Sequence, residues 1–178
     1  MAMHVPAPVL LDRDGTIVVD ADYPRDPTLV RFIPGAERAL RELSRLGHPL
    51  AVVSNQSGVG RGLVTRAEAD AVHQRFLKLL ADAGIGVAGV YYCFHSPYEE
   101  CDCRKPLPGL LTRAISELRF GAPRFMVGDK PSDIAAGGRA GCATIWLEAG
   151  REYPHNESEP DYKAQDWDEV LRIILRQE

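Results

Sequence analysis

The sequence predicts an α/β fold in which one doubly wound parallel sheet carries helices on both faces. Two observations predict it: short apolar runs that hardly alternate with polar residues, and helical patterns that separate these runs. Strands buried on both faces lack alternation, and helices between strands permit parallel pairing. Strands are expected at Ala7 to Leu11, Pro49 to Val53, Ala88 to Cys93, Arg124 to Val127 and Ala143 to Leu147. A chain of 178 residues fits a single Rossmann-like domain that spans residues 1–178.

The segments between the strands carry amphipathic helical spacing and clear end signals. Thr65 and Glu68 form a capping-box pair at the start of the longest helix, and Gly84 follows its last turn. The helices are expected at Pro34 to Leu46, Thr65 to Ala83, Pro108 to Leu118 and Asp168 to Leu175. The segment Arg151 to Asp161 holds two prolines and several charges, which predicts a loop before a short final strand.

Charge and hydropathy argue against several classes of partner. The formal net charge is −4 and the sequence pI is about 5.8, whereas proteins that bind nucleic acid or anionic membranes carry clustered Lys and Arg. No apolar run approaches the roughly 20 residues that a membrane helix needs, and the first residues lack a signal-peptide pattern. We therefore expect a cytoplasmic protein that acts on a small molecule.

Chemically reactive residues follow the ends of the predicted strands. In doubly wound sheets, ligands bind beyond the carboxyl ends of the strands. Asp12, Ser54 and Asp129 each follow such a run, and Cys93 closes another. We expect these four residues to meet at one edge of the sheet.

The segment Asp12 to Thr16 reads Asp-Arg-Asp-Gly-Thr. Two carboxylates one residue apart can divide the work of covalent phosphate transfer, because one attacks phosphorus while the other transfers protons. A plain Asp-Gly turn and part of a calcium loop are the alternatives. The calcium loop is the weaker of the two, since its later Glu ligand is missing.

The segment Ser54 to Gly62 is rich in glycine and serine. Such a loop lets backbone N–H groups approach an anion, and the Ser54 hydroxyl can donate to a phosphoryl oxygen. Taken alone, the same composition also describes an ordinary mobile connection.

Three cysteines and one histidine lie within eleven residues, at Cys93, His95, Cys101 and Cys103. Zinc takes four such ligands, and a closed set of protein ligands indicates a structural site. Unconnected buried thiols are the alternative, because each pair has one intervening residue instead of the commoner two. A zinc-stabilised loop requires reduced thiols and therefore a reducing compartment.

Two further segments carry charge suited to a phosphate and its metal. Arg104 and Lys105 directly follow the last predicted zinc ligand, which would fix both cations in place. Asp129 follows a strand where a helix is expected to open, and Asp133 lies one helical turn later. A surface basic pair and a helix cap at Ser132 are the simpler interpretations.

In this order, the motifs between Asp12 and Asp133 resemble those of the haloacid dehalogenase superfamily of aspartate-nucleophile phosphatases. The resemblance implies that Asp12 is the nucleophile and Asp14 the general acid and base. It also implies that Ser54 and Lys105 hold the phosphoryl oxygens.

The same resemblance implies a magnesium site. Its ligands would be Asp12, the backbone carbonyl of Asp14, and Asp129, with Asp133 as a supporting acidic neighbour. An anionic nucleophile that approaches an anionic phosphate needs this positive charge.

Within the superfamily, Cys-x-His followed by Cys-x-Cys-Arg-Lys-Pro-x-Pro-Gly resembles a capless branch that comprises heptose bisphosphate and histidinol-phosphate phosphatases. Asn55 to Gly58, Arg61-Gly62 and Gly128 to Lys130 resemble the phosphatases that remove the 7-phosphate of D-glycero-D-manno-heptose 1,7-bisphosphate. The short loop between His95 and Cys101 resembles the histidinol-phosphate branch instead.

The heptose alternative assigns a role to the remaining cations, because a bisphosphate carries a second phosphate that is not cleaved. The expected substrate-binding set is Ser54, Asn55, Arg61, Arg104, Lys105 and Lys130. We expect a monomer with no cap domain. A phosphotransferase and a non-catalytic zinc-stabilised binding domain remain as alternatives from other classes.

Overall fold

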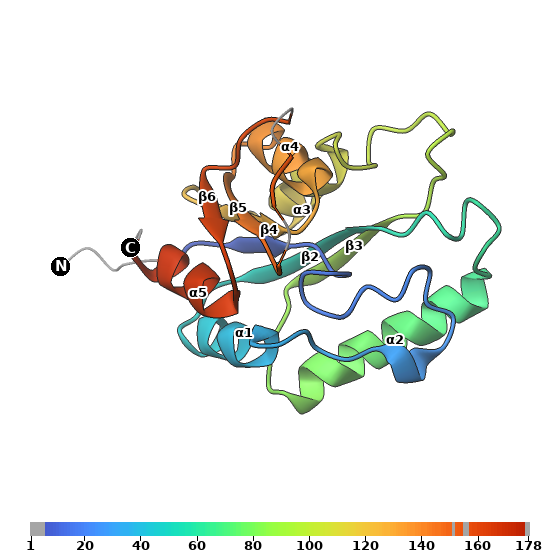
Figure 1. Cartoon of the computed structure of the whole chain (residues 1–178), viewed down its shortest axis with the longest axis horizontal. Coiled ribbons are helices and arrows are strands. Elements are labelled where there is room, and N and C mark those ends of the chain that lie inside the picture. Colours follow the sequence, from blue (N-terminus) through green and yellow to red (C-terminus); the bar gives the residue numbers. More distant parts are fainter. Residues whose placement is uncertain (1–5, 151, 155–156, 177–178) are drawn as a thin grey trace.

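The computed structural model describes residues 6–150, 152–154 and 157–176. Within them, six parallel strands form one sheet in the order β3-β2-β1-β4-β5-β6 (Figure 1). The strands are β1 Val9–Leu11, β2 Leu50–Asn55, β3 Gly89–Cys93, β4 Phe125–Gly128, β5 Ala143–Leu147 and β6 Tyr162–Ala164. The order reverses between β1 and β4, which confirms the predicted doubly wound sheet and marks the place where such folds bind ligands.

Helices cover both faces of the sheet, as predicted (Figure 1). The helices are α1 Ala36–Arg45, α2 Arg66–Asp82, α3 Gly109–Glu117, α4 Pro131–Arg139 and α5 Trp167–Arg176. Helices α3 and α4 lie on one face, and α1, α2 and α5 lie on the other. A 3-10 helix, Pro27–Leu29, was not predicted. In the loop predicted at 151–161, Arg151, His155 and Asn156 lie outside the described residues.

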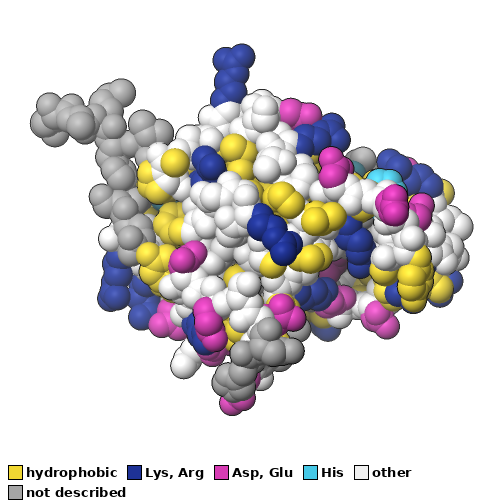
Figure 2. All heavy atoms as spheres, turned by 90° about the horizontal axis from the view of Figure 1, so that it is seen from above, with side chains coloured by type: hydrophobic (Ala, Val, Ile, Leu, Met, Phe, Trp, Pro, Cys, Tyr) yellow, Lys and Arg dark blue, Asp and Glu magenta, His cyan; other side chains and the backbone are white. Residues whose placement is uncertain are grey.

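On the α3 and α4 side, basic and acidic side chains are interspersed over the surface (Figure 2). The described residues on this face mix cations and anions, whereas proteins that bind nucleic acid present clustered basic side chains. Among the described residues, no helix is long and apolar enough to cross a membrane.

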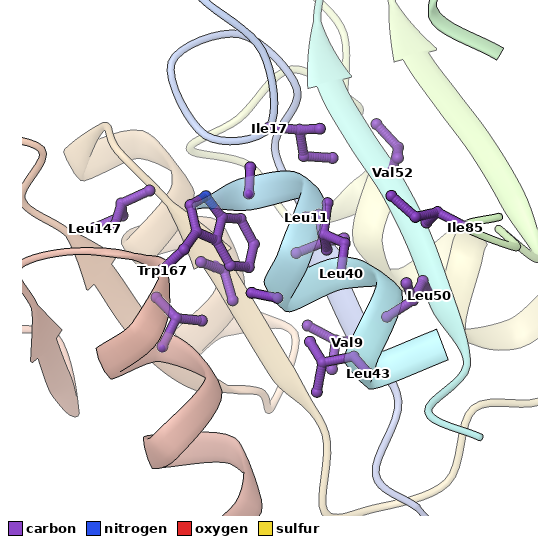
Figure 3. Packing of buried hydrophobic residues seen from close by; sticks show 14 of the residues in the cluster. Val9, Leu11, Ile17, Leu40, Leu43, Leu50, Val52, Ile85, Leu147 and Trp167 are labelled. Carbon is purple, nitrogen blue, oxygen red and sulfur yellow. The ribbon is translucent and has the colours of Figure 1, made fainter. Parts of the chain in front are cut away.

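The strand interiors are buried from both sides, which explains why the apolar runs do not alternate. Val9 and Leu11 pack with α1 and α5, while Leu10 between them packs with α3 and α4. Trp167 lies in the same hydrophobic cluster as Val9 and Leu11, beside α1 (Figure 3). Its indole Nε1 donates to the carbonyl of Thr16 at 2.8 Å. Helix α5 therefore supports the loop that follows the β1 strand.

The predicted ends of the longest helix are confirmed. The Thr65 hydroxyl accepts from the Glu68 amide, and the Glu68 carboxylate accepts from the Thr65 amide. Gly84 follows with φ 69°, a left-handed conformation that favours glycine.

Candidate active site at the carboxyl edge of the sheet

A buried ion pair between Asp12 and Lys105 lies at the centre of the site. Asp12 follows β1 and is 4% exposed, and Lys105 is 3% exposed. The Lys105 Nζ atom donates to Asp12 Oδ1 and to the Val53 carbonyl, both at 2.8 Å, and lies 2.6 Å from Asp133 Oδ1. Burial lowers the pKa of Lys105, but the Asp12 and Asp133 carboxylates outweigh it and raise that pKa above its usual value. The group is therefore an ammonium held beside a carboxylate.

Three buried carboxylates, Asp12, Asp129 and Asp133, form an acidic cluster with oxygens within 4.8 Å of one another. Burial, reinforced by Asp12 and against the opposing charge of Lys105, raises the pKa of Asp133 to about 7. One ammonium does not offset three carboxylates, so the cluster fits a divalent cation with oxygen ligands, such as Mg²⁺.

The backbone around this cluster is shaped to bring the carboxylates together. Gly15 has φ 82°, and a Cβ atom there would collide with the Asp129 carboxylate. Thr16 Oγ1 donates to Asp129 Oδ1 at 3.1 Å. Asp133 Oδ2 accepts from the Lys130 amide at 3.0 Å at the start of α4. The simpler interpretation, a helix cap at Ser132, is wrong, because Lys130 is the N-cap residue.

The Asp14 side chain lies apart from the acidic cluster. Its carboxylate accepts hydrogen bonds from the buried Arg13 guanidinium and from Gln56 Nε2. Asp14 nevertheless lines the cavity that leads to Asp12. Asp14 thus belongs to the wall of this cavity without being one of the clustered acids.

Ser54 and Asn55 end β2 beside Lys105. The Ser54 hydroxyl is buried and accepts from Gln56 Nε2 at 3.1 Å. Asn55 Oδ1 accepts from the Lys105 amide at 3.0 Å, and its Nδ2 donates to the Lys105 carbonyl at 2.9 Å. Asn55 therefore fixes the backbone that carries Lys105, a contact that the sequence did not indicate.

An open cavity of about 430 Å³ leads to this site. A small recess of about 30 Å³ at its base holds Asp12 and Asp133 and shares Asp14 with the larger space. The cavity is lined by Asp14, Asp20, Asp22, Tyr23, Pro24, Asn55, Gln56, Ser57, Arg104, Lys105, Pro106, Lys130 and Ser132. The larger cavity therefore has room for a sugar-sized group, while the recess at its base holds Asp12.

Of the three other basic residues in the predicted substrate-binding set, two line the cavity and one does not. Arg104 and Lys130 line the cavity, and Lys130 Nζ lies 3.0 Å from Asp20 Oδ2. Arg61 does not line it: its guanidinium donates to Tyr23 Oη at 2.6 Å and lies 5.4 Å from the Tyr23 ring centre. Asp20 and Tyr23 were not singled out from the sequence.

The four predicted zinc ligands converge beside this cavity. Their ligand atoms lie within 4.8 Å of one another, with Cys93 Sγ 3.1 Å from Cys103 Sγ and 4.0 Å from Cys101 Sγ, and His95 Nδ1 3.3 Å from Cys103 Sγ. Tetrahedral zinc with bonds of about 2.3 Å requires sulfur atoms about 3.8 Å apart. All three cysteines are free thiols, and burial raises the pKa of Cys93 to about 12. The donor set fits a zinc ion, which would hold these thiols as thiolates.

The Cys/His cluster is joined to the cavity wall by backbone contacts. The Gln56 amide donates to the Cys93 carbonyl at 2.7 Å, and the Gly60 amide to the Phe94 carbonyl at 3.0 Å. Lys105 lies two residues after the last cluster cysteine. These hydrogen bonds join the start of the Cys/His cluster to the loop that follows β2, and the end of the cluster continues directly into the segment that carries Lys105.

Comparisons with known proteins agree with this geometry. Residues 102–170 match the family model for HAD-hydrolase-like proteins. The chain is 37% identical to D-glycero-beta-D-manno-heptose-1,7-bisphosphate 7-phosphatase of Escherichia coli (strain K12), over 100% of this chain and 98% of that protein. The chain belongs to the haloacid dehalogenase-like hydrolase family.

Two further proteins with similar names support the assignment of this chain to the family. The Salmonella typhi protein of the same name is 42% identical over 81% of this chain and 80% of its own. The crystal structure of D,D-heptose 1,7-bisphosphate phosphatase from B. bronchiseptica, complexed with magnesium and phosphate, superposes with a TM-score of 0.88. That structure is 29% identical in sequence and covers 97% of this chain and 99% of its own.

Proposed function

We propose that this protein is a magnesium-dependent phosphatase that hydrolyses the 7-phosphate of D-glycero-D-manno-heptose 1,7-bisphosphate. The observation that carries the proposal is the buried Asp12 and Lys105 pair beside Asp129 and Asp133, at the base of a sugar-sized cavity. The substrate assignment is supported by the similarity to the heptose bisphosphate phosphatase of Escherichia coli, because that similarity spans the full chain.

In the proposed reaction, the Asp12 carboxylate attacks phosphorus and forms an aspartyl phosphate. The bond between phosphorus and the sugar oxygen breaks, its electron pair stays with that oxygen, and Asp14 donates the proton. Asp14 then takes a proton from the water that attacks phosphorus. The bond between phosphorus and the Asp12 oxygen breaks, which restores the Asp12 carboxylate and releases inorganic phosphate. Lys105 and Ser54 hold the phosphoryl oxygens, while Asn55 positions Lys105.

Asp12, the Asp14 carbonyl and Asp129 would hold the magnesium ion, with Asp133 as their acidic neighbour. When bound, the ion supplies the positive charge that lets an anionic nucleophile approach an anionic phosphate. Arg104 and Lys130 would bind the phosphate that is not cleaved. Arg61 would orient the Tyr23 side chain, which lines the same cavity.

The cluster of Cys93, His95, Cys101 and Cys103 would hold a structural zinc ion. Because three thiols must stay reduced to serve as ligands, the proposal places the protein in a reducing, cytoplasmic compartment. The protein would be a single capless domain that is active as a monomer.

We expect a preference of ~100-fold or more in kcat/KM for the heptose bisphosphate over histidinol phosphate, about 2.7 kcal/mol at the transition state. The reason is that Arg104 and Lys130 have a second phosphate to bind only in the bisphosphate. The measurement is phosphate release with magnesium, for both heptose anomers and for histidinol phosphate.

Histidinol phosphate is the second candidate substrate, because the loop between His95 and Cys101 has only five residues. A preference for histidinol phosphate would overturn the substrate assignment and leave the phosphatase mechanism standing. If the protein hydrolyses neither compound, that result contradicts the proposed function as a whole.

We expect Cys101→Ser to lower zinc content and thermal stability before it alters the chemistry, because a hydroxyl is a poor replacement for a thiolate ligand. Elemental analysis should give about one zinc per wild-type chain and clearly less for the variant. Cys142→Ser is the matched control, since Cys142 is buried outside the cluster. Full zinc occupancy in Cys101→Ser would contradict the proposed ligand set.

A further inference from the structure

Arg13 is a buried cation, 2% exposed, that lies directly behind Asp14. Its Nε donates to both carboxylate oxygens of Asp14 at 3.1 Å, and its Nη2 donates to Asp14 Oδ2 at 2.9 Å. Burial lowers the pKa of Arg13, but the Asp14 charge and the Tyr92 hydroxyl outweigh it and raise that pKa. The guanidinium therefore stays charged and forms a forked contact with one carboxylate.

The contacts of the two Asp14 oxygens are unequal. Oδ2 accepts from Arg13 Nε, from Arg13 Nη2 and, at 2.7 Å, from Gln56 Nε2. Among the described residues, Oδ1 accepts only from Arg13 Nε. A carboxylic acid can carry a transferable proton only on an oxygen with a free lone pair. Oδ1 is thus the oxygen of Asp14 that is suited to exchange a proton with the substrate.

Arg13 is itself held in a fixed orientation by groups from other elements. Its Nη1 donates to Tyr92 Oη at 3.2 Å, and its Nη2 donates to Gln56 Oε1 at 2.8 Å. The guanidinium carbon lies 5.2 Å from the Tyr92 ring centre and 6.0 Å from that of Phe76. His73 Nδ1 lies 3.1 Å from the same Tyr92 hydroxyl. Strand β3, helix α2 and the loop that follows β2 together fix a cation that contacts the proposed general acid.

We propose that Arg13 is a positioning residue that saturates Asp14 Oδ2 and presents Asp14 Oδ1 to the oxygen of the leaving sugar. As the bond between phosphorus and that oxygen breaks and the bond from Asp12 forms, the proton moves from Oδ1 to the sugar oxygen. This inference rests on the proposed function, because it assigns a partner to the general acid of the same reaction.

The test compares two leaving groups in the Arg13→Lys variant. A lysine keeps the charge but cannot make the forked contact, so Asp14 loses its orientation. We expect kcat/KM to fall ~100-fold or more for the heptose bisphosphate, whose alkoxide must be protonated as it leaves. For p-nitrophenyl phosphate, whose phenolate leaves without a proton, we expect a loss of less than ~10-fold.

An equal loss for both substrates would overturn the proposal, because a general disturbance of the site slows both reactions alike. Tyr92→Phe is the second variant, since it keeps the ring beside Arg13 and removes only the hydroxyl. It should show the same selective loss on a smaller scale, and it carries the test if Arg13→Lys does not fold.

Arg113→Lys is the matched control, because Arg113 is exposed on α3 and contacts only Glu117 and the Tyr91 ring in the described structure. It should hydrolyse both substrates like the wild type. Failure of the wild type itself to hydrolyse the heptose phosphate would count against the proposed function. The role of Arg13 is tested separately by the ratio of kcat/KM for the heptose bisphosphate to kcat/KM for p-nitrophenyl phosphate, measured in each variant.

Discussion

Asp12→Asn should abolish turnover, with a loss of ~10⁴-fold or more in kcat for the heptose bisphosphate. An amide is not a nucleophile toward phosphorus, so no aspartyl phosphate can form. The fold should survive, because asparagine has nearly the same shape and Lys105 Nζ keeps its contacts with the Val53 carbonyl and with Asp133. Phosphate release, circular dichroism and thermal unfolding check the two parts of this expectation.

Asp82→Asn is the matched control for this change. Asp82 lies at the exposed end of α2 and pairs with Lys78, so its substitution should leave both activity and stability nearly unchanged. Substantial turnover by a folded Asp12→Asn protein would refute the nucleophile assignment. Loss of the folded state would show instead that Asp12 is needed for the fold.

The architecture could be predicted from the sequence because it depends on local patterns. Apolar runs without alternation indicate strands covered on both sides, and the Thr65 and Glu68 pair marks a helix start with little dependence on tertiary context. Since parallel strands end at one edge, residues after β1 and β4 had to meet there. Asp12 and Asp129 could be brought together on that argument alone.

The partners of the site residues could not be predicted in the same way. Asn55 contacts the backbone of Lys105, fifty positions away, and Lys130 pairs with Asp20, which is 110 positions away. Such pairs depend on the exact course of loops, which carry no periodic signal. Charged residues are also expected at the surface, so nothing in the sequence indicated that Arg13 would be buried.

Lys105→Met should lower kcat/KM by ~10³-fold and the free energy of unfolding by about 3–5 kcal/mol. Lys105 is the only cation recorded in contact with the Asp12 and Asp133 carboxylates in the described structure, so its loss leaves buried charges without a partner. The same substitution removes the ammonium that would hold a phosphoryl oxygen. Denaturant unfolding and steady-state kinetics measure the two losses separately.

Lys78→Met provides the comparison for this variant, because Lys78 is exposed on α2 and its salt bridge contributes little. It should change stability by no more than about 0.5 kcal/mol and leave kcat/KM unaltered. Saturating magnesium should restore part of the stability of Lys105→Met, since a cation at the acidic cluster offsets the same carboxylates. Wild-type activity in a stable Lys105→Met protein would show that the ammonium contributes to neither folding nor phosphate binding, and would remove Lys105 from the proposed mechanism.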